Sequence, residues 1–241
     1  MAAAATTPQE QLLDWYSTRH PFPVNLVGEY AGSSPFVIDG DSLLRHIFSD
    51  SRIDFSSGFQ LLHAVYAVER FLDNLTRRNC VFDVVFFEQH RRVAVPAWNK
   101  KGAWKYAFAR AVVIRHLQAL KREGDGFVYR FGSVRDEEFQ TWLQARRPLF
   151  VMAHDGEDIL EEGVEEEEAA EGGEAAEEWE VKAMIYRFMH MGRSYNVAQI
   201  NSVVFSDSKV RGYFSDQWLR GGDADWCLDP RFTHRGWTAT F

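Results

Sequence analysis

The chain is poor in cysteine and has no long apolar run. Its 241 residues include only Cys80 and Cys227, without a Cys-x-x-Cys motif or a cluster of histidine and cysteine. Neither a disulfide framework nor a structural zinc site is indicated, so we expect a reducing compartment, the cytoplasm or the nucleus. No apolar run approaches the ~20 residues that span a bilayer, and the first residues lack the features of a signal peptide. We therefore expect no membrane partner.

Sequence motifs for nucleotide hydrolysis are also lacking. There is no Gly-x-x-x-x-Gly-Lys-Ser/Thr phosphate loop, and the segment 136–139 does not complete an Asp-Glu-x-Asp/His helicase box. No serine stands in a Gly-x-Ser-x-Gly nucleophile elbow. We therefore expect that the chain by itself is not an ATPase and that it uses no nucleotide cofactor.

Two segments carry charges of a single sign and lack the opposite charge. Residues 157–180 carry thirteen acids and no lysine or arginine, whereas residues 91–122 carry nine bases and no acid. Like charges among alanine and glycine cannot bury enough surface to offset chain entropy, so the acidic segment is predicted to be a disordered insertion. The remaining 22 acids and 27 bases give the rest of the chain a net charge of +5, against −8 for the whole. The basic segment is either a polyanion-binding surface or the solvated face of a helix.

Apolar runs and helical periodicities alternate along the chain. Strands are predicted at 36–38, 82–87, 127–131, 149–153 and 200–205, and helices at 61–75, 103–122, 136–146 and 181–191. Ser57 and Gln60 have the spacing of a capping box before the first helix. The residues predicted to face inward from the second helix are Trp104, Phe108, Ala111, Val112 and Leu120. Repeated strand–helix–strand order predicts an α/β fold with a mostly parallel central sheet flanked by helices.

Three of the predicted strands end in acidic residues. Asp39 and Asp41 follow the first strand, Glu88 follows the second and Asp155 follows the fourth. Because the carboxyl ends of parallel strands meet at one edge of a sheet, we expect these carboxylates to converge there. Their mutual repulsion would be relieved by Mg²⁺ or Mn²⁺, which prefer oxygen ligands. The four acids are therefore candidate catalytic and metal-binding residues.

A simpler role is open for each of these acids. Asp39 could cap the turn that follows its strand, and Asp41 could be the N-cap of the next helix. Glu88 stands beside polar residues and could be an exposed loop acid. Asp155, followed by a glycine, could belong to a turn. The residues alone leave these alternatives open.

Three segments carry a resemblance to a known family. The segments FVIDGDSLL at 36–44, GFQLLHAVY at 58–66 and FDVVFFE at 82–88 resemble the N-terminal region of Ski-type DExD/H-box RNA helicases, the interferon-inducible antiviral class and its fungal relatives. The resemblance covers roughly residues 10–215 and is most specific before residue 90. It implies a PIN-like fold, similar in outline to the core of flap endonucleases.

The resemblance also implies site residues. In PIN and flap nucleases, acids at strand ends hold divalent metals that activate water against a phosphodiester. The corresponding residues here are Asp39 with Asp41 beside it, then Glu88 and Asp155. Glu88 stands where flap nucleases have aspartate, and no helix-borne acid aligns with theirs. These departures put catalysis in question and leave the fold intact.

Two functions follow from the resemblance. The first is an RNA-binding PIN-like module without the ATPase motor of the helicases, whose partners are RNA and proteins of RNA surveillance or decay. The residues then expected to contact the RNA backbone are Arg91, Arg92, Lys100, Lys101 and Lys105. The alternative is a Mg²⁺- or Mn²⁺-dependent nuclease that cleaves RNA phosphodiesters through the strand-end carboxylates. We favour the first, because an incomplete acid set weakens metal binding more readily than it prevents folding.

The predicted organisation has four segments. Residues 1–156 form the first part of the PIN-like domain, and residues 157–180 form the acidic disordered insertion. Residues 181–216 supply the final helix and strand of the same domain. An irregular C-terminal tail occupies residues 217–241.

Overall fold

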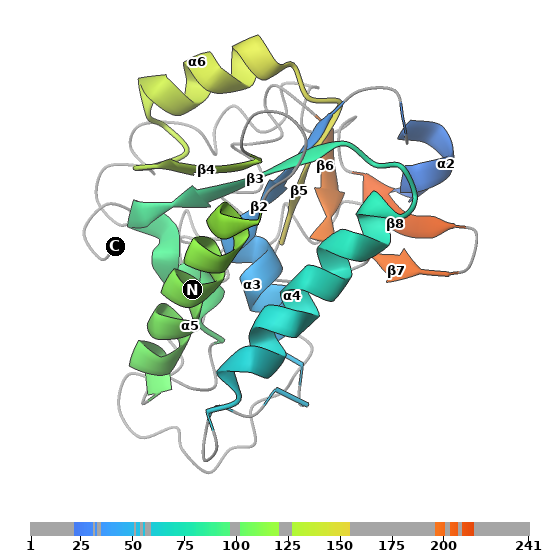
Figure 1. The fold of residues 1–241 in the computed structure, drawn as a ribbon. Coiled ribbons are helices and arrows are strands. Elements are labelled where there is room, and N and C mark those ends of the chain that lie inside the picture. Colours follow the sequence, from blue (N-terminus) through green and yellow to red (C-terminus); the bar gives the residue numbers. More distant parts are fainter. Residues whose placement is uncertain are drawn as a thin grey trace, which may run out of the picture.

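The described part of the chain forms one sheet with helices on both faces (Figure 1). The computed structural model describes residues 22–30, 32, 35–50, 52, 53, 55, 59–96, 102–120, 127–154, 196–200, 203–206 and 209–214. The predicted insertion at 157–180, helix at 181–191 and tail at 217–241 lie outside these ranges. No helix within the described ranges is both long and apolar enough to cross a membrane.

Five parallel strands form the centre of the sheet. They are β2 (Phe36–Asp39), β3 (Phe82–Phe87), β4 (Val128–Phe131), β5 (Phe150–Ala153) and β6 (Asn196–Gln199). Their order is β6-β5-β2-β3-β4, so β2 lies in the middle and β3 is its neighbour. The predicted α/β fold with a mostly parallel sheet is confirmed. Because β5 and β6 come from opposite sides of the segment 157–180, both parts of the chain build one sheet.

An antiparallel edge extends the sheet beyond β6. The strand β8 (Val210–Phe214) pairs antiparallel with β6, with β1 (Phe22–Asn25) and with the short β7 (Val204–Phe205). The prediction of one last strand at 200–205 is therefore wrong, because the parallel strand ends at Gln199 and the chain then turns back onto β8. Strands this short carry too few residues to show a clear alternation in the sequence.

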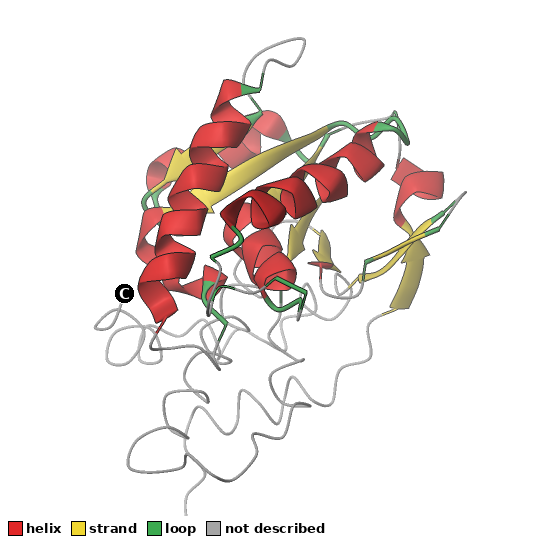
Figure 2. Ribbon diagram, turned by 60° about the horizontal axis from the view of Figure 1, so that its bottom comes forward, coloured by secondary structure: helices red, strands yellow, loops and turns green. Residues whose placement is uncertain are grey.

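Helices cover the two faces of the sheet unequally. The helices α3 (Gly40–Phe48), α4 (Leu61–Thr76) and α5 (Ala103–Ala119) lie on one face, and α6 (Glu137–Arg146) lies on the other. The 3₁₀ helix η1 (Glu88–Ala94) follows β3 directly, and the short α2 (Leu26–Tyr30) contacts β8. Figure 2 shows α4 and α5 crossing the sheet on the same side.

Both faces of the central strands are buried. Phe36 and Ile38 of β2 belong to the main core, which also contains residues of α3, α4 and α5. On the other face, the ring of Phe87 meets the ring of Phe139 of α6 edge-on, with 4.9 Å between the ring centroids. Burial on both faces is the reason that β2 and β3 read as continuous apolar runs in the sequence.

One predicted feature of the helices is wrong, and another is wrong in part. The N-cap of α4 is Gln60, which makes no side-chain cap hydrogen bond, so the predicted capping box does not start this helix; Ser57 lies outside the described residues. The second feature is the inward face of α5: the prediction holds for Val112 and Leu120, which pack against the core, and is wrong for the exposed Trp104, Phe108 and Ala111. Trp104 is 64% exposed and Phe108 is 50% exposed, because the helix is turned so that another stripe packs on the core. That buried stripe consists of Tyr106, Ala109, Arg110, Val113, Ile114 and Leu117.

Candidate functional site

The carboxyl end of β2 passes directly into α3, and Asp39 is the residue at the junction. Its carboxylate Oδ1 accepts hydrogen bonds from the backbone N–H groups of Asp41 at 3.1 Å and Ser42 at 3.4 Å. The Ser42 hydroxyl donates to Oδ2 at 2.7 Å. Asp39 is thus the N-cap of α3, and it satisfies backbone donors that the first turn of a helix leaves open.

Gly40 allows this sharp turn to lie against the neighbouring strand. A Cβ atom at this position would overlap the ring of Phe86 in β3. The absence of a side chain therefore brings the start of α3 close to β3. The glycine between the two aspartates is explained by this close approach.

Asp41 lies in the first turn of α3 and is fully buried. Its Oδ2 accepts the backbone N–H of Phe87 at 3.0 Å, which ties α3 to the carboxyl end of β3. Its Oδ1 accepts a hydrogen bond from Arg110 Nε at 2.6 Å. Asp41 is therefore not the N-cap of the helix, and its carboxylate is half of a buried ion pair.

Arg110 reaches this edge of the sheet from α5 and joins three groups. Besides Asp41, its Nη2 donates to the carbonyl oxygen of Phe87 at 3.2 Å, and its Nη1 lies 3.6 Å from Oε1 of Glu88. The Arg110 side chain is 7% exposed. Although burial lowers the pKa of Arg110, the charges and hydrogen bonds of Asp41 and Glu88 more than offset this and keep its pKa above the ordinary value.

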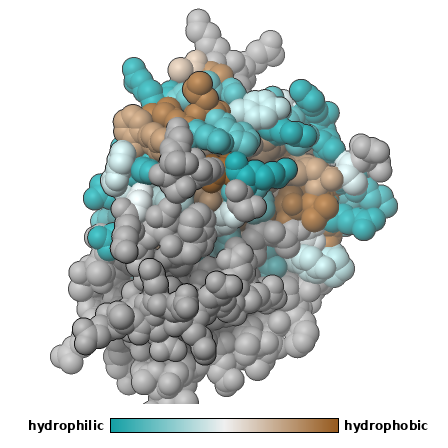
Figure 3. All heavy atoms as spheres, turned by 90° about the horizontal axis from the view of Figure 1, so that it is seen from below, coloured by the Kyte–Doolittle hydropathy of each residue, from teal (hydrophilic) through white to brown (hydrophobic). Residues whose placement is uncertain are grey.

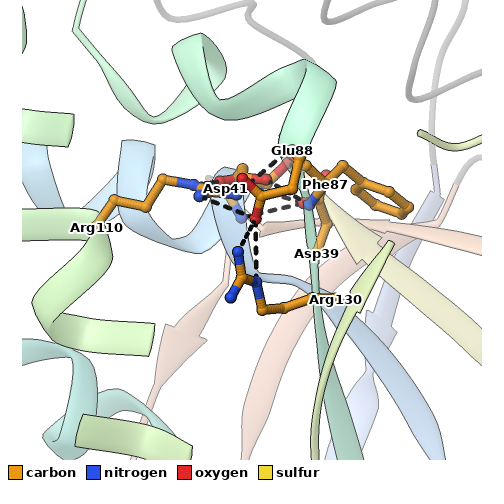
Figure 4. Close-up of polar contacts among 7 residues, drawn as sticks. Asp39, Asp41, Phe87, Glu88, Arg110 and Arg130 are labelled. Carbon is orange, nitrogen blue, oxygen red and sulfur yellow. Dashed lines mark hydrogen bonds and ion pairs between the residues drawn. The ribbon is translucent and has the colours of Figure 1, made fainter. Parts of the chain in front are cut away.

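Glu88 follows β3 at the surface and is held by two arginines (Figure 4). Arg130 of β4 donates to Glu88 Oε1 from Nε at 3.1 Å and from Nη2 at 2.8 Å. Burial by itself raises the pKa of Glu88, but the hydrogen bond from Arg130 and the charges of Arg110 and Arg130 lower it below the ordinary value. Glu88 is therefore held as a carboxylate.

The turn from β2 into α3 and the acids around it lie inside a region that a known family shares. The family model of the PIN-like domain of the ATP-dependent RNA helicase DDX60 matches residues 18–163, which is more than half of the chain. The chain belongs to this family. No curated protein and no solved structure matches the chain. The suspected relation to the N-terminal PIN-like region of antiviral DExD/H-box helicases is confirmed.

The described acids of this PIN-like domain, taken alone, do not fit a divalent metal. Both carboxylate oxygens of Asp39 and both of Asp41 already accept hydrogen bonds from protein donors. The guanidinium of Arg110 supplies the positive charge between Asp41 and Glu88. Within the described ranges, no three Asp, Glu, His or Cys side chains are placed to hold one ion. The role of Asp39, Asp41 and Glu88 as metal ligands therefore remains a prediction that this geometry does not support.

The fourth predicted acid, Asp155, lies outside the described residues. The described residue next to it is the buried His154, which follows the end of β5. Of the predicted acids, the structure brings Asp39, Asp41 and Glu88 to one edge of the PIN-like domain, at the carboxyl ends of β2 and β3. The structure also places Arg110 among these acids.

The predicted RNA-contacting residues are placed unequally. Arg91 and Arg92 are exposed on η1, three and four residues after Glu88. Lys105 is half-buried on α5, and its Nζ donates a hydrogen bond to the backbone oxygen of Phe55. The other two, Lys100 and Lys101, lie outside the described residues. Arg91 and Arg92 are thus the predicted contacts that the structure displays at the domain surface.

Sequence reasoning missed Arg110 and Arg130 as members of the site. Arg110 was counted only as one of nine bases, yet it falls within the apolar stripe Tyr106, Ala109, Val113 and Leu117. A lone arginine in such a stripe is a signal for a buried acidic partner. The same reasoning missed a second pair, in which Arg146 of α6 contacts the buried carboxylate of Asp83 in β3.

Proposed function

We propose that this PIN-like domain binds RNA without cleaving it, at the carboxyl edge of its sheet. The observation that carries the proposal is the neutralisation of the strand-end acids by arginines of the same chain. Asp41 and Glu88 share Arg110, and Glu88 also binds Arg130. An edge of this kind does not repel a polyanion as an open acidic site would.

The charge balance of this edge supports the proposal. The three acids Asp39, Asp41 and Glu88 stand beside the four arginines Arg91, Arg92, Arg110 and Arg130. Two of the acids are fully buried, whereas Arg91, Arg92 and Arg130 are exposed. Among these seven side chains, the ones that meet solvent are therefore three arginines and the partly exposed Glu88.

Exposed arginines suit phosphate recognition. A guanidinium offers a fixed fork of donors that matches two phosphate oxygens, and its charge persists at every physiological pH. In this proposal Arg91 and Arg92 contact the RNA backbone, Arg130 adds charge beside them, and Lys100, Lys101 and Lys105 extend the contact. Backbone contacts of this kind give little base preference.

The test is RNA affinity across a salt series for the full chain and two matched double variants. Arg91→Ala with Arg92→Ala removes two exposed bases at the carboxyl edge, and Lys209→Ala with Arg211→Ala removes two exposed bases at β8 and the turn before it. Each lost phosphate contact lowers the log–log salt slope by ~0.7 for a single strand, so the edge variant is expected to lose about 1.4. The β8 variant is expected to keep the slope of the unmodified chain. Equal slopes in all three proteins would contradict the proposal.

A second measurement separates binding from cleavage. Labelled RNA is incubated with the chain in Mg²⁺, in Mn²⁺ and in EDTA, and its length is followed on a denaturing gel. We expect intact RNA in all three conditions, because Arg110 occupies the space between the acids. Metal-dependent cleavage that disappears in Asp41→Asn would instead establish the nuclease function.

A further inference from the structure

Four large apolar side chains are exposed on the adjoining helices α4 and α5. On α5, Trp104 is 64% exposed and Phe108 is 50% exposed; on α4, Leu62 is 82% exposed and Tyr66 is 56% exposed. We call these four side chains the aromatic face. Figure 3 looks from below, toward the starts of α4 and α5, and shows apolar areas among hydrophilic residues on this end of the described part. Exposed rings in such number need an explanation beyond folding.

The rings on α5 are anchored to the core. Phe59, which precedes α4, lies with its ring centroid 6.0 Å from that of Trp104 and 5.8 Å from that of Phe108. Phe59 in turn contacts the buried ring of Phe55 at 5.3 Å. A side chain fixed in this way loses little conformational freedom when it binds a ligand. The two α5 rings of the aromatic face are therefore held in place before any partner arrives.

Cations accompany the rings on both helices. Residues 104, 108, 111 and 115 recur at helical spacing, so Trp104, Phe108 and the exposed Arg115 share one side of α5. Arg70 is also exposed and follows Tyr66 by one turn on α4. The sequence of α5 contains no acid.

The acids of α4 cancel only part of this charge. Glu69 is paired with His116 of α5, with 2.8 Å between Oε1 and Nε2. The other acid of α4, Asp73, is exposed and lies one turn beyond Arg70. Lys105 adds a further cation, because its Nζ lies 5.9 Å from the centroid of the Trp104 ring. The three cations Arg70, Arg115 and Lys105 therefore outnumber the two acids.

We propose that the aromatic face stacks the bases of single-stranded RNA, while Arg70, Arg115 and Lys105 attract its phosphates. This inference rests on the proposed function and names the form of RNA that the domain takes. Three of the four exposed apolar side chains are rings, and base–ring stacking needs bases that are not already paired within a duplex. An apolar protein segment would use the rings but would leave the arginines without a complementary charge.

The experiment measures the affinity of the full chain for a labelled single-stranded oligouridine and for an RNA duplex of the same length, at one fixed salt concentration. Trp104→Ala and Phe108→Ala remove one exposed ring each. Tyr213→Ala removes an exposed ring from β8, outside the aromatic face, and is the matched control. Thermal unfolding of each variant establishes that it is folded.

We expect each of the two α5 variants to lose about 5- to 150-fold in affinity for the single strand, the range for one stacked base. Their duplex affinity should stay unchanged, and Tyr213→Ala should bind both RNAs like the unmodified chain. Unchanged single-strand affinity in both α5 variants would overturn the inference. If Arg91→Ala with Arg92→Ala still weakens binding in that case, the proposed function stands while the aromatic face serves a protein partner. If the unmodified chain binds neither RNA, the proposed function itself fails.

Discussion

At the scale of single residues, Arg110 holds the carboxyl edge of the sheet together. Its side chain contacts Asp41, the backbone of Phe87 and Glu88 at once, and so it connects α5, α3 and β3. Asp41 is fully buried and Arg110 nearly so. A buried pair of this kind contributes little net stability compared with apolar residues, but each charge depends on the other.

The first prediction concerns the loss of one partner of this pair. Arg110→Met leaves the Asp41 carboxylate buried without its cation, and we expect a loss of ~3–5 kcal/mol in the free energy of unfolding. Asp41→Asn combined with Arg110→Met removes both charges and should recover part of that loss. Urea unfolding of the single and double variants gives the interaction energy in a double-mutant cycle. Losses that simply add would mean that the two side chains do not interact.

The second prediction uses the lowered pKa of Glu88. Because the pKa in the folded state lies below the ordinary value of 4.5, Glu88 contributes stability that is fully present above pH 4.5 and is lost as the pH falls through the folded-state pKa. The stability difference between the unmodified chain and Glu88→Gln should therefore shrink as the pH falls below 4.5. The effect is small, since 41% of the side chain is exposed to solvent.

Urea unfolding at a series of pH values checks this difference. Burial raises the pKa of Asp83, which gives stability the opposite pH dependence, but both proteins contain Asp83 and its contribution cancels in the difference. A difference that stays constant, or that grows toward acid, would show that the arginines around Glu88 do not stabilise its charged form.

At the scale of elements, the strands were easier to predict than the face of a helix. β2, β3 and β5 are buried on both sides, so their apolar runs stand out in the sequence and fix their position to within a residue or two. In α5 the bulky Trp104 and Phe108 suggested an inward face, but that role belongs to the stripe that contains Arg110. A charged residue makes a buried stripe hard to recognise in the sequence, because the acidic partner of that residue lies far away along the chain.

The candidate site could likewise be predicted only in part from the sequence. The acids were found because they follow apolar strands directly, and the parallel order of β2 and β3 brings Asp41 and Glu88 together. The arginine partners of these acids could not be found from the sequence, since Arg110 and Arg130 come from other elements and no local pattern links them to the acids. The structure was therefore needed to show that arginines neutralise the acids at this edge.

The third prediction concerns the end of α6. This helix ends at Arg146, and its C-cap residue Arg147 has a φ of 47° and a ψ of 58°, which place it in the left-handed region. Only glycine adopts that conformation without a steric cost, so Arg147→Gly is expected to raise the free energy of unfolding by ~0.5–1 kcal/mol. The matched control is Gln144→Gly, an exposed position within α6, which should lose ~1 kcal/mol. Thermal and urea unfolding of both variants provide the measurement, and a loss in Arg147→Gly would contradict the prediction.

At the scale of the whole molecule, the sheet is assembled from segments on both sides of the acidic run. β5 ends at Ala153 and β6 begins at Asn196, and the two are neighbouring parallel strands. The connection between them therefore comprises residues 154–195. A parallel crossover needs about a dozen residues or more to return to the start of the next strand.

The fourth prediction follows from the length of this connection. Deleting residues 157–180 leaves 154–156 and 181–195, which is 18 residues and still long enough for a crossover. The deletion also removes thirteen acids, whose mutual repulsion disfavours a compact state. We expect cooperative thermal unfolding at a nearly unchanged midpoint, together with a net charge that changes from −8 to +5. Replacing the thirteen acids by glutamine and serine at constant length separates the two effects. A broad transition for the deletion but not for the neutralised chain would show that β5 and β6 need the full connection, and a broad transition for both would show that the acids themselves stabilise the fold.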